Sequence, residues 1–131
     1  MKSILYKELT DNIIKLAIEV QKELGLGFLE RVYENALIIA LQEEDLVVDQ
    51  QKQLDVYFRG HNVGIYVADM VVEEKIILEI KAVENISRPH YAQLINYLKA
   101  SGMEVGYVIN FGRIPLQFKR HAKSNQSTEK T

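Results

Sequence analysis

The 131-residue chain contains no cysteine, which excludes disulfide bonds, thiolate chemistry and cysteine-bound zinc. It has no apolar run approaching the about 18 residues of a membrane-spanning helix, and Met1 to Leu9 is too short and mixed for a signal peptide. A glycine-rich phosphate-binding loop is also missing, since neither G-x4-G-K-[ST] nor G-x-G-x2-G occurs. These absences predict a cytoplasmic protein with no membrane association and no nucleotide-driven chemistry.

An excess of positive charge is lacking as well, because the formal net charge is -2. Tight DNA-binding domains usually carry a basic surplus, so any affinity for nucleic acid is expected to be modest, salt-sensitive and local. The candidate basic patch consists of Arg113, Lys119 and Arg120 as nucleic-acid-binding residues, accompanied by His121 and Lys123. An ordinary basic terminus explains this patch equally well.

The most informative pattern is D-x9-E-x-K, formed by Asp69, Glu79 and Lys81. Residues 63–72 and 75–82 are apolar and β-branched and are separated by two glutamates, which predicts two strands in a tight hairpin. Alternation along the second run places Glu79 and Lys81 on one face. An E-x-K pair alone is more often a solvated ion pair, but charged groups in so apolar a strand are costly unless paired or liganded. The cluster is therefore suited to metal-dependent phosphodiester hydrolysis.

A helix predicted over residues 28–44 supplies a further carboxylate. Its apolar stripe puts Glu30 at the edge of the buried face and Glu34 further towards solvent. Glu30 is therefore the candidate for an inward-facing carboxylate. A glutamate near a helix N-terminus is also favoured by the helix dipole, which requires no function.

A second predicted helix, over residues 89–100, carries Gln93 and Tyr97 one turn apart on a flanking face. The two side chains could reach the same ligand or strand end. A polar pair at this spacing ordinarily lies on the surface, so it supports a functional site only in combination with the acidic residues of the two strands.

The other segments are typical of a scaffold and predict an α/β fold in the order α-α-β-β-β-α-β, with a sheet flanked by helices. One domain is expected over residues 1–121. Residues 122–131 have no apolar content to anchor them and are predicted to be disordered. The remaining predicted elements are a helix capped by Thr10 or Asp11 and ending at Gly25, a strand over 54–58 and a final strand over 105–110.

The stretch Gly27 to Tyr33, GFLERVY, resembles the GxxExxY signature of a family of small bacterial and archaeal proteins. The resemblance covers roughly residues 5–121, and several blocks in order are more specific than one. Family members often have Tyr-Arg-Ala-Asp before the first ligand, so Val67 departs from the pattern. The other matching blocks are Ala68-Asp69, Glu79-Ile80-Lys81, Ala92 to Leu98 and Ile109-Asn110-Phe111.

That family is placed in the PD-(D/E)XK nuclease superfamily, and Gln93-x3-Tyr97 resembles the QxxxY motif of its RecB-like branch. The resemblance implies a restriction endonuclease-like core with a mixed sheet. It further implies that Lys81 is the catalytic lysine and that Gln93 and Tyr97 support the site or contact DNA. The carboxylates it implies as metal ligands and catalytic groups are Glu30, Asp69 and Glu79.

The implied activity is Mg²⁺- or Mn²⁺-dependent hydrolysis of phosphodiester bonds in nucleic acid, with DNA as the expected polymer and an exonuclease-like action. A catalytically weak adaptor that keeps the nuclease fold and binds nucleic acid or protein stays as the alternative. Small chains of this superfamily often act as homodimers or with a partner protein, and either arrangement is expected here.

Overall fold

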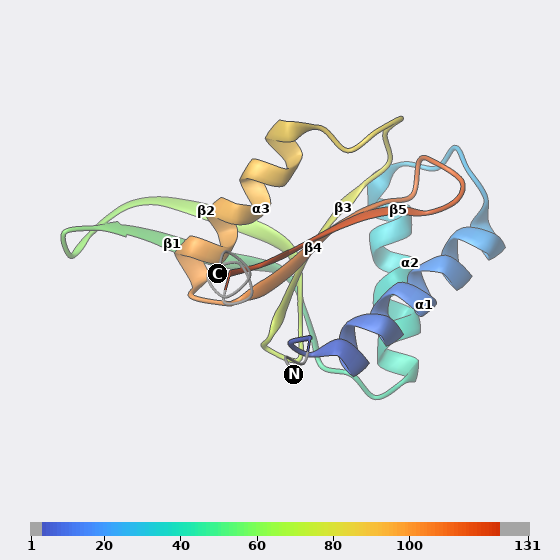
Figure 1. Ribbon diagram of the computed structural model, residues 1–131, viewed down its shortest axis with the longest axis horizontal. Helices are drawn as coiled ribbons and strands as arrows, with labels where there is room; N and C mark the ends of the chain where they lie inside the picture. The colour runs from blue at the N-terminus through green and yellow to red at the C-terminus, as the bar shows by residue number, and fades with distance from the viewer. Residues whose placement is uncertain (1–3, 124–131) are drawn as a thin grey trace.

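The computed structural model describes residues 4–123, which form a five-stranded sheet with helices on both faces (Figure 1). The strands lie in the order β1-β2-β3-β4-β5, and every neighbouring pair is antiparallel except β3 and β4. The mixed α/β fold is therefore confirmed. The elements are α1 (Lys7–Leu24), α2 (Glu30–Glu43), β1 (Val48–Phe58), β2 (His61–Val72), β3 (Ile76–Lys81), α3 (Arg88–Ser101), β4 (Val105–Asn110) and β5 (Gln117–Ala122).

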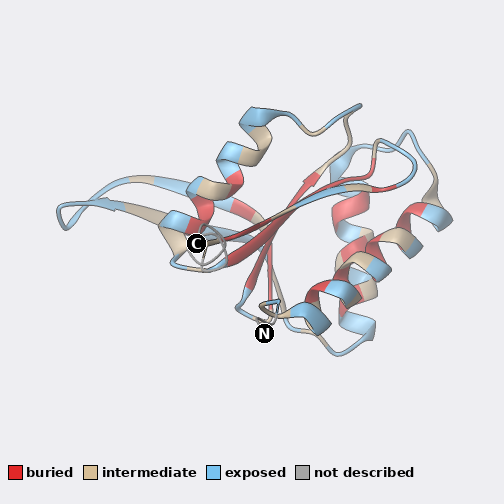
Figure 2. Cartoon of the chain, viewed as in Figure 1, coloured by how far each residue is buried: buried red, intermediate tan, exposed pale blue. Residues whose placement is uncertain are grey.

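The two faces of β3 enter two separate apolar cores. Ile76, Leu78 and Ile80 pack with α1 and α2, whereas Ile77 packs with α3 residues such as Leu94. The predicted alternation along β3 is thus correct, and the central strands are buried on both faces (Figure 2). Because α3 connects the parallel strands β3 and β4, the chain can cover the second face without a long loop.

The β2–β3 hairpin turns at Glu73 and Glu74, as the sequence predicts. Their φ angles are 54° and 56°, and the Lys75 N–H donates to the Val72 carbonyl at 3.0 Å. Two consecutive left-handed residues are typical of a type I′ turn, whose twist matches that of the flanking strands. This turn sets the register between β2 and β3.

Two strands extend beyond the prediction. β1 begins at Val48 rather than residue 54, because the polar segment before Leu54 pairs along β2 at the edge of the sheet, where no apolar alternation is needed. β5 was not expected at all, since its sequence QFKRHA carries no apolar run. The order is therefore α-α-β-β-β-α-β-β.

The chain termini also differ from the prediction. Helix α1 begins at Lys7, so Thr10 and Asp11 lie inside it rather than at its cap, and Thr10 is buried. Ala122 is buried at the end of β5 and is ordered, whereas the predicted disorder of residues 124–131 lies outside the described residues. Among residues 4–123, no helix has both the length and the apolarity needed to cross a membrane.

Tyr33 connects α2 to the loop that precedes it. The buried ring stacks on Phe111 at a centroid distance of 4.9 Å, while its hydroxyl donates to the Gly25 carbonyl at 2.6 Å. The same hydroxyl accepts a hydrogen bond from the Phe28 N–H at 3.3 Å. Tyr33 therefore fixes the position at which α2, and with it Glu30, begins.

We expect Tyr33→Phe to lower the free energy of unfolding by about 1–2 kcal/mol, because the part-buried Gly25 carbonyl loses its donor and the Phe28 N–H its acceptor. Urea denaturation measured beside Tyr57→Phe, which changes an exposed phenol, checks this value. Equal losses in the two variants would contradict the anchoring role.

Candidate active site

Asp69 and Glu79 lie at a fork between β2 and β3. The paired ladder of these strands covers Val72–Ile76 to Met70–Leu78 and stops there. Beyond it, the two acidic side chains replace the ladder: the Asp69 N–H donates to Glu79 Oε2 at 2.9 Å, and the Ile80 N–H donates to Asp69 Oδ2 at 2.7 Å. The backbone thus holds both carboxylates across the opening of the sheet.

The two carboxylates occupy an environment that disfavours their charge. Glu79 is only 5 % exposed. Burial, followed by the nearby charge of Asp69, raises the pKa of Glu79 to about 8. Burial also raises the pKa of Asp69, against the opposing effect of the hydrogen bond from Ile80. Such a pair is stabilised by a proton or by a cation, and perturbed carboxyl pairs of this kind cluster at functional sites.

Lys81 is the last residue of β3 and lies on the same face as Glu79, partly exposed. Its positive charge lowers the pKa of both Asp69 and Glu79, so it lies within electrostatic reach of the pair. It forms no salt bridge with any carboxylate among residues 4–123. The ammonium group is therefore available to a ligand that approaches the fork.

Asn110, opposite Lys81 on β4, organises the loop that follows β3. Its side chain accepts from the Val83 and Gly112 N–H groups and donates to the Val83 carbonyl and to Gln117 Oε1, each at 2.9 Å. Asn110 is fully buried and completely hydrogen-bonded. Sequence reasoning gave Asn110 no role, although it was part of a matching block.

The orientation of α2 differs from the prediction. Glu34 is buried, with 3 % of its surface exposed, whereas Glu30 at the first turn is exposed. The reason is that the apolar side chains of Leu29 and Val32 are exposed, and the buried side of α2 is formed by Tyr33, Glu34, Leu37 and Leu41. This rotation turns Glu34 inwards and Glu30 to the rim.

Glu34 is held by two glutamines of β1. Its Oε2 accepts hydrogen bonds from the side-chain amides of Gln50 at 2.9 Å and Gln51 at 2.8 Å. Gln51 has a φ of 54°, and its position lies opposite Asp69, where the pairing of β1 with β2 is interrupted. The charge of Glu34 raises the pKa of both Asp69 and Glu79. Glu34 is thus a third acidic neighbour, and the repeated glutamines were its only sequence signal.

An open cleft of about 500 Å³ lies between the start of α2 and the fork. Three carboxylates line it, from Glu30, Glu34 and Asp69, together with Arg31 and three apolar residues. The structure therefore brings Glu30 and Asp69 to one opening, as expected, and adds Glu34. Glu79, which was expected to open into the same cleft, does not line it and is buried beside Asp69.

Helix α3 brings Gln93 and Tyr97 to the other side of the fork. The Gln93 amide donates to the Tyr97 hydroxyl, and Tyr97 is buried. Burial raises the pKa of Tyr97, and the charges of Glu79 and Asp69 raise it further, so the phenol lies close to both carboxylates. The predicted pairing of Gln93 with Tyr97 beside the site agrees with this arrangement.

Arg113, Lys119 and Arg120, the basic residues expected to form one patch, lie apart from one another in the described part of the chain. Arg113 donates to Asn85 in the loops beyond the ends of β3 and β4, at the edge of the sheet where Lys81 lies. Lys119 and Arg120 are consecutive on β5 and therefore face opposite sides of the sheet.

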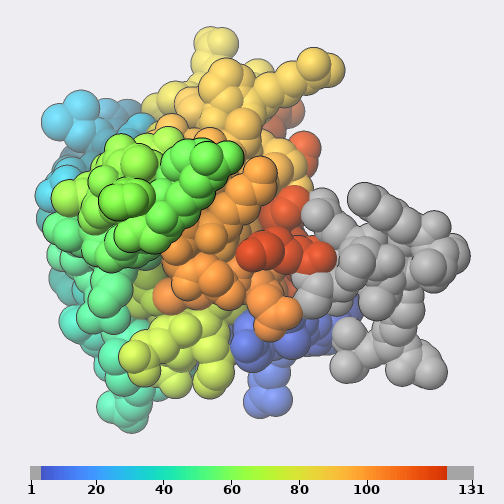
Figure 3. All heavy atoms as spheres, turned by 90° about the vertical axis from the view of Figure 1, so that its left-hand side faces the viewer, coloured from blue at the N-terminus to red at the C-terminus, as the bar shows by residue number. Residues whose placement is uncertain are grey.

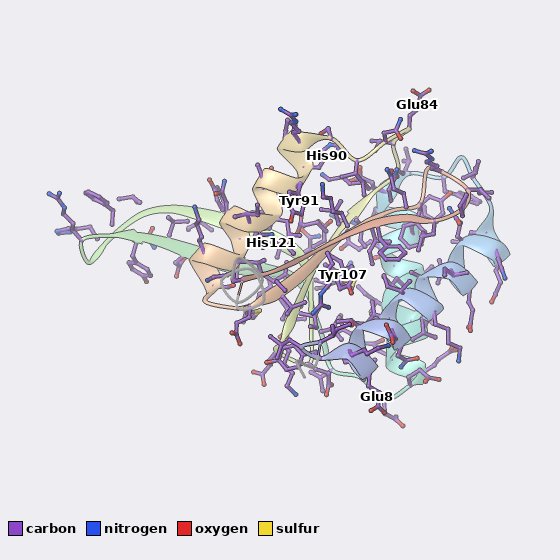
Figure 4. All side chains as sticks on the ribbon, viewed as in Figure 1. Glu8, Glu84, His90, Tyr91, Tyr107 and His121 are labelled. Atoms are coloured by element: carbon purple, nitrogen blue, oxygen red, sulfur yellow. The ribbon has the colours of Figure 1, made fainter. Side chains whose placement is uncertain are left out.

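Their contacts confirm that separation. The Lys119 ammonium lies 4.4 Å from the ring centroid of Tyr91, whereas Arg120 donates to the Tyr107 hydroxyl at 3.1 Å on the α1 side. His121 is buried, with Nδ1 2.6 Å from the Tyr91 hydroxyl (Figure 4). Lys119 and Arg120 therefore do not share the single basic surface expected from the sequence, because the strand β5, which was not predicted, directs them to two faces of the sheet.

The donor set at the fork fits a hard divalent cation. No group of three or more His, Asp or Glu side chains able to hold a metal ion exists among residues 4–123. Each of Asp69 and Glu79 uses one oxygen for a backbone N–H, and no hydrogen bond within this part of the chain engages Asp69 Oδ1 or Glu79 Oε1. Mg²⁺ is commonly bound by one or two carboxylates plus waters and substrate phosphate, so two carboxylates suffice.

Comparisons with known proteins agree with this geometry. No curated protein and no solved structure matches the chain. A family model described as the PD-(D/E)XK nuclease superfamily matches residues 7–121, a span that contains every element from α1 to β4 and the residues of the fork. An acidic pair at a strand fork, followed by a lysine two residues later, lies within that match, and the chain belongs to the PD-(D/E)XK nuclease superfamily.

Proposed function

We propose that this protein hydrolyses phosphodiester bonds of nucleic acid with the help of a divalent metal ion. The supporting observation is the fork, where Asp69 and Glu79 share one buried, charge-disfavouring environment beside the ammonium group of Lys81. This environment favours the binding of a cation. Membership of the nuclease superfamily suggests that such a cation would serve in phosphodiester hydrolysis.

We assign Asp69 and Glu79 as the residues that would hold Mg²⁺ or Mn²⁺. When bound, the ion would lower the pKa of a coordinated water and neutralise charge on the phosphate. Lys81 donates to the phosphate and stabilises the negative charge that develops during hydrolysis, and it orients the attacking water. Lysine suits this role as a compact, strongly hydrated point charge.

The acidic groups of α2 have separate roles in this proposal. Glu34, fixed by Gln50 and Gln51, adds negative potential that attracts the cation to the fork. Glu30 lies at the rim of the same cleft as Asp69, from where its carboxylate would reach the ion through a bridging water rather than as a third direct ligand. The Gln93–Tyr97 pair positions the substrate on the opposite side.

The GFLERVY segment and the Gln93-x3-Tyr97 helix support membership of the GxxExxY family and of the RecB-like branch, respectively. On this basis the expected substrate is DNA and the expected action exonuclease-like. Arg113, beyond the ends of β3 and β4, is the basic residue best placed to contact the substrate near the fork. A cytoplasmic location and a homodimer or partner protein belong to the same proposal.

The proposal is tested by incubating the protein with labelled single- and double-stranded DNA and RNA in a series of metal ions. We expect cleavage of at least one polymer with Mg²⁺ or Mn²⁺, loss of cleavage with EDTA and recovery when excess Mg²⁺ is restored. Binding of a polymer without cleavage under any metal condition would contradict hydrolysis. That outcome would favour the adaptor function instead.

A further inference from the structure

The β1–β2 hairpin projects from the body of the molecule as an arm that carries exposed apolar side chains (Figures 1 and 2). Tyr57 is 63 % exposed, Phe58 58 % and Ile65 56 %. The arm turns at Arg59 and Gly60, both left-handed, so its two strands stay paired to the tip. Exposed apolar surface concentrated on one projection marks an interaction site.

The two faces of the arm differ in their surroundings. Leu54 pairs with Tyr66, and this pair faces α3 because Leu54 belongs to the α3 core. Between the arm and α3 lies an open groove of about 380 Å³, and Figure 3, viewed from the hairpin side, shows the green hairpin beside the orange segments that include α3. The groove is lined by Val56, Tyr57, Tyr66, Asn96, Lys99 and Ala100.

The lining of this groove combines aromatic faces with positive charge. Among residues 4–123, Lys99 is the one charged side chain that lines it and no carboxylate does, although acidic residues outnumber basic ones in the chain. The two phenol rings offer stacking surfaces and the Asn96 amide offers hydrogen bonds. Aromatic rings with a nearby cation are the elements with which proteins bind unpaired bases and a phosphate backbone.

A ring contact links the groove to the fork. The ring of Tyr66 lies 5.3 Å from the ring of Tyr97, tilted by 59°. Tyr97 in turn lies within electrostatic reach of Asp69 and Glu79, whose charges raise its pKa. A chain of nucleotides in the groove would therefore be led from the arm, past Tyr66, to the carboxylates of the fork.

We propose that the groove between the β1–β2 hairpin and α3 binds a single-stranded segment of the nucleic acid, with bases stacked on Tyr57 and Tyr66 and phosphate contacted by Lys99. This assignment rests on the proposed function and specifies the form of its substrate. Unpaired bases fit the groove because their faces are free to stack, whereas the bases of a duplex already stack on one another.

The test compares affinities for a labelled single-stranded oligonucleotide and its duplex by fluorescence anisotropy, with Ca²⁺ replacing Mg²⁺ to prevent turnover. We expect Tyr57→Ala to weaken single-strand binding at least about fivefold, and Tyr57→Phe to retain it, because stacking needs the ring. Lys99→Gln is expected to reduce both affinity and its dependence on salt. The matched control is Ile65→Ala, on the opposite face of the arm.

Equal single-strand affinity of Tyr57→Ala and wild type would overturn the assignment. So would sedimentation showing that Tyr57→Ala dissociates a dimer while oligonucleotide affinity is unchanged, since the face would then bind a second copy. Cleavage assays separate this failure from that of the proposed function. If the wild-type protein cleaves nucleic acid and Tyr57→Ala changes neither KM nor kcat, only the groove assignment is contradicted. If binding depends on Tyr57 but no cleavage occurs, only the proposed hydrolysis is contradicted.

Discussion

Replacing Lys81 by alanine is expected to lower the rate of phosphodiester cleavage by at least about 10²–10³-fold. The ammonium at the end of β3 is the cation that acts on both Asp69 and Glu79, and no salt bridge within residues 4–123 engages it. In the proposed reaction it stabilises charge that exists only in the transition state. Its loss should therefore reduce kcat while KM changes little.

The matched control for this substitution is Lys75→Ala, which removes an exposed lysine at the other end of β3. The control should keep wild-type activity, and both variants should show the wild-type circular dichroism spectrum and thermal midpoint to within a few degrees. Cleavage by Lys81→Ala at a rate within tenfold of wild type would contradict the role assigned to the lysine. An inactive Lys81→Ala that still binds oligonucleotide as tightly would support it.

Replacing Glu79 by glutamine is expected to stabilise the metal-free protein at alkaline pH by up to about 5 kcal/mol, because the pKa of Glu79 rises from 4.5 to about 8 and each pKa unit corresponds to about 1.36 kcal/mol. The ordinary pKa of this carboxyl is 4.5, whereas the folded protein raises it to about 8. Between these values the folded state holds a proton that the unfolded chain releases. Wild-type stability should therefore fall as the pH rises through this interval and level off above about 8.

Glutamine removes the titrating group while it still offers an oxygen to the Asp69 N–H. Urea unfolding in EDTA at pH 5.5 and pH 8.5 should thus show a large pH dependence for wild type and a smaller one for Glu79→Gln. Glu74→Gln, at the exposed turn, serves as the control. The same pH dependence in all three proteins would show that burial of Glu79 does not control stability.

The strands that carry the site could be predicted because their signal is local. The β2–β3 hairpin follows from β-branched runs around two glutamates, and the shared face of Glu79 and Lys81 follows from the twofold repeat of a strand. Asp69 and Glu79 were consequently expected on neighbouring strands, where the structure has them.

The orientation of α2 could not be predicted in the same way. Its apolar stripe is broad enough to allow more than one rotation, and the choice depends on contacts made far away in sequence. Stacking of Tyr33 on Phe111 and the hydrogen bonds from Gln50 and Gln51 decide it, and they turn Glu34 inwards. A helical periodicity alone contains no information about these partners.

The polar segments at the two edges of the sheet could not be predicted from the sequence either. The first half of β1 and the whole of β5 are polar and are stabilised by pairing with a neighbour, so neither shows the apolar pattern used to recognise a strand. Because β5 was not predicted, Lys119 and Arg120 were expected on one surface, whereas the strand directs them to opposite faces. The strands of the arm, by contrast, were expected over residues 54–58 and 63–72, and the structure pairs them as a hairpin that projects from the sheet (Figure 1).

The three residues Glu73 to Lys75 between the paired positions Val72 and Ile76 set the register of the candidate site. Counting from them, Asp69 and Glu79 fall just past the last paired positions, Met70 and Leu78, so the acids meet where the strands part. A slip of one residue would invert every side chain of one strand and send its acid to the other layer. The length of the loop between β2 and β3 thus determines whether Asp69 and Glu79 lie next to each other.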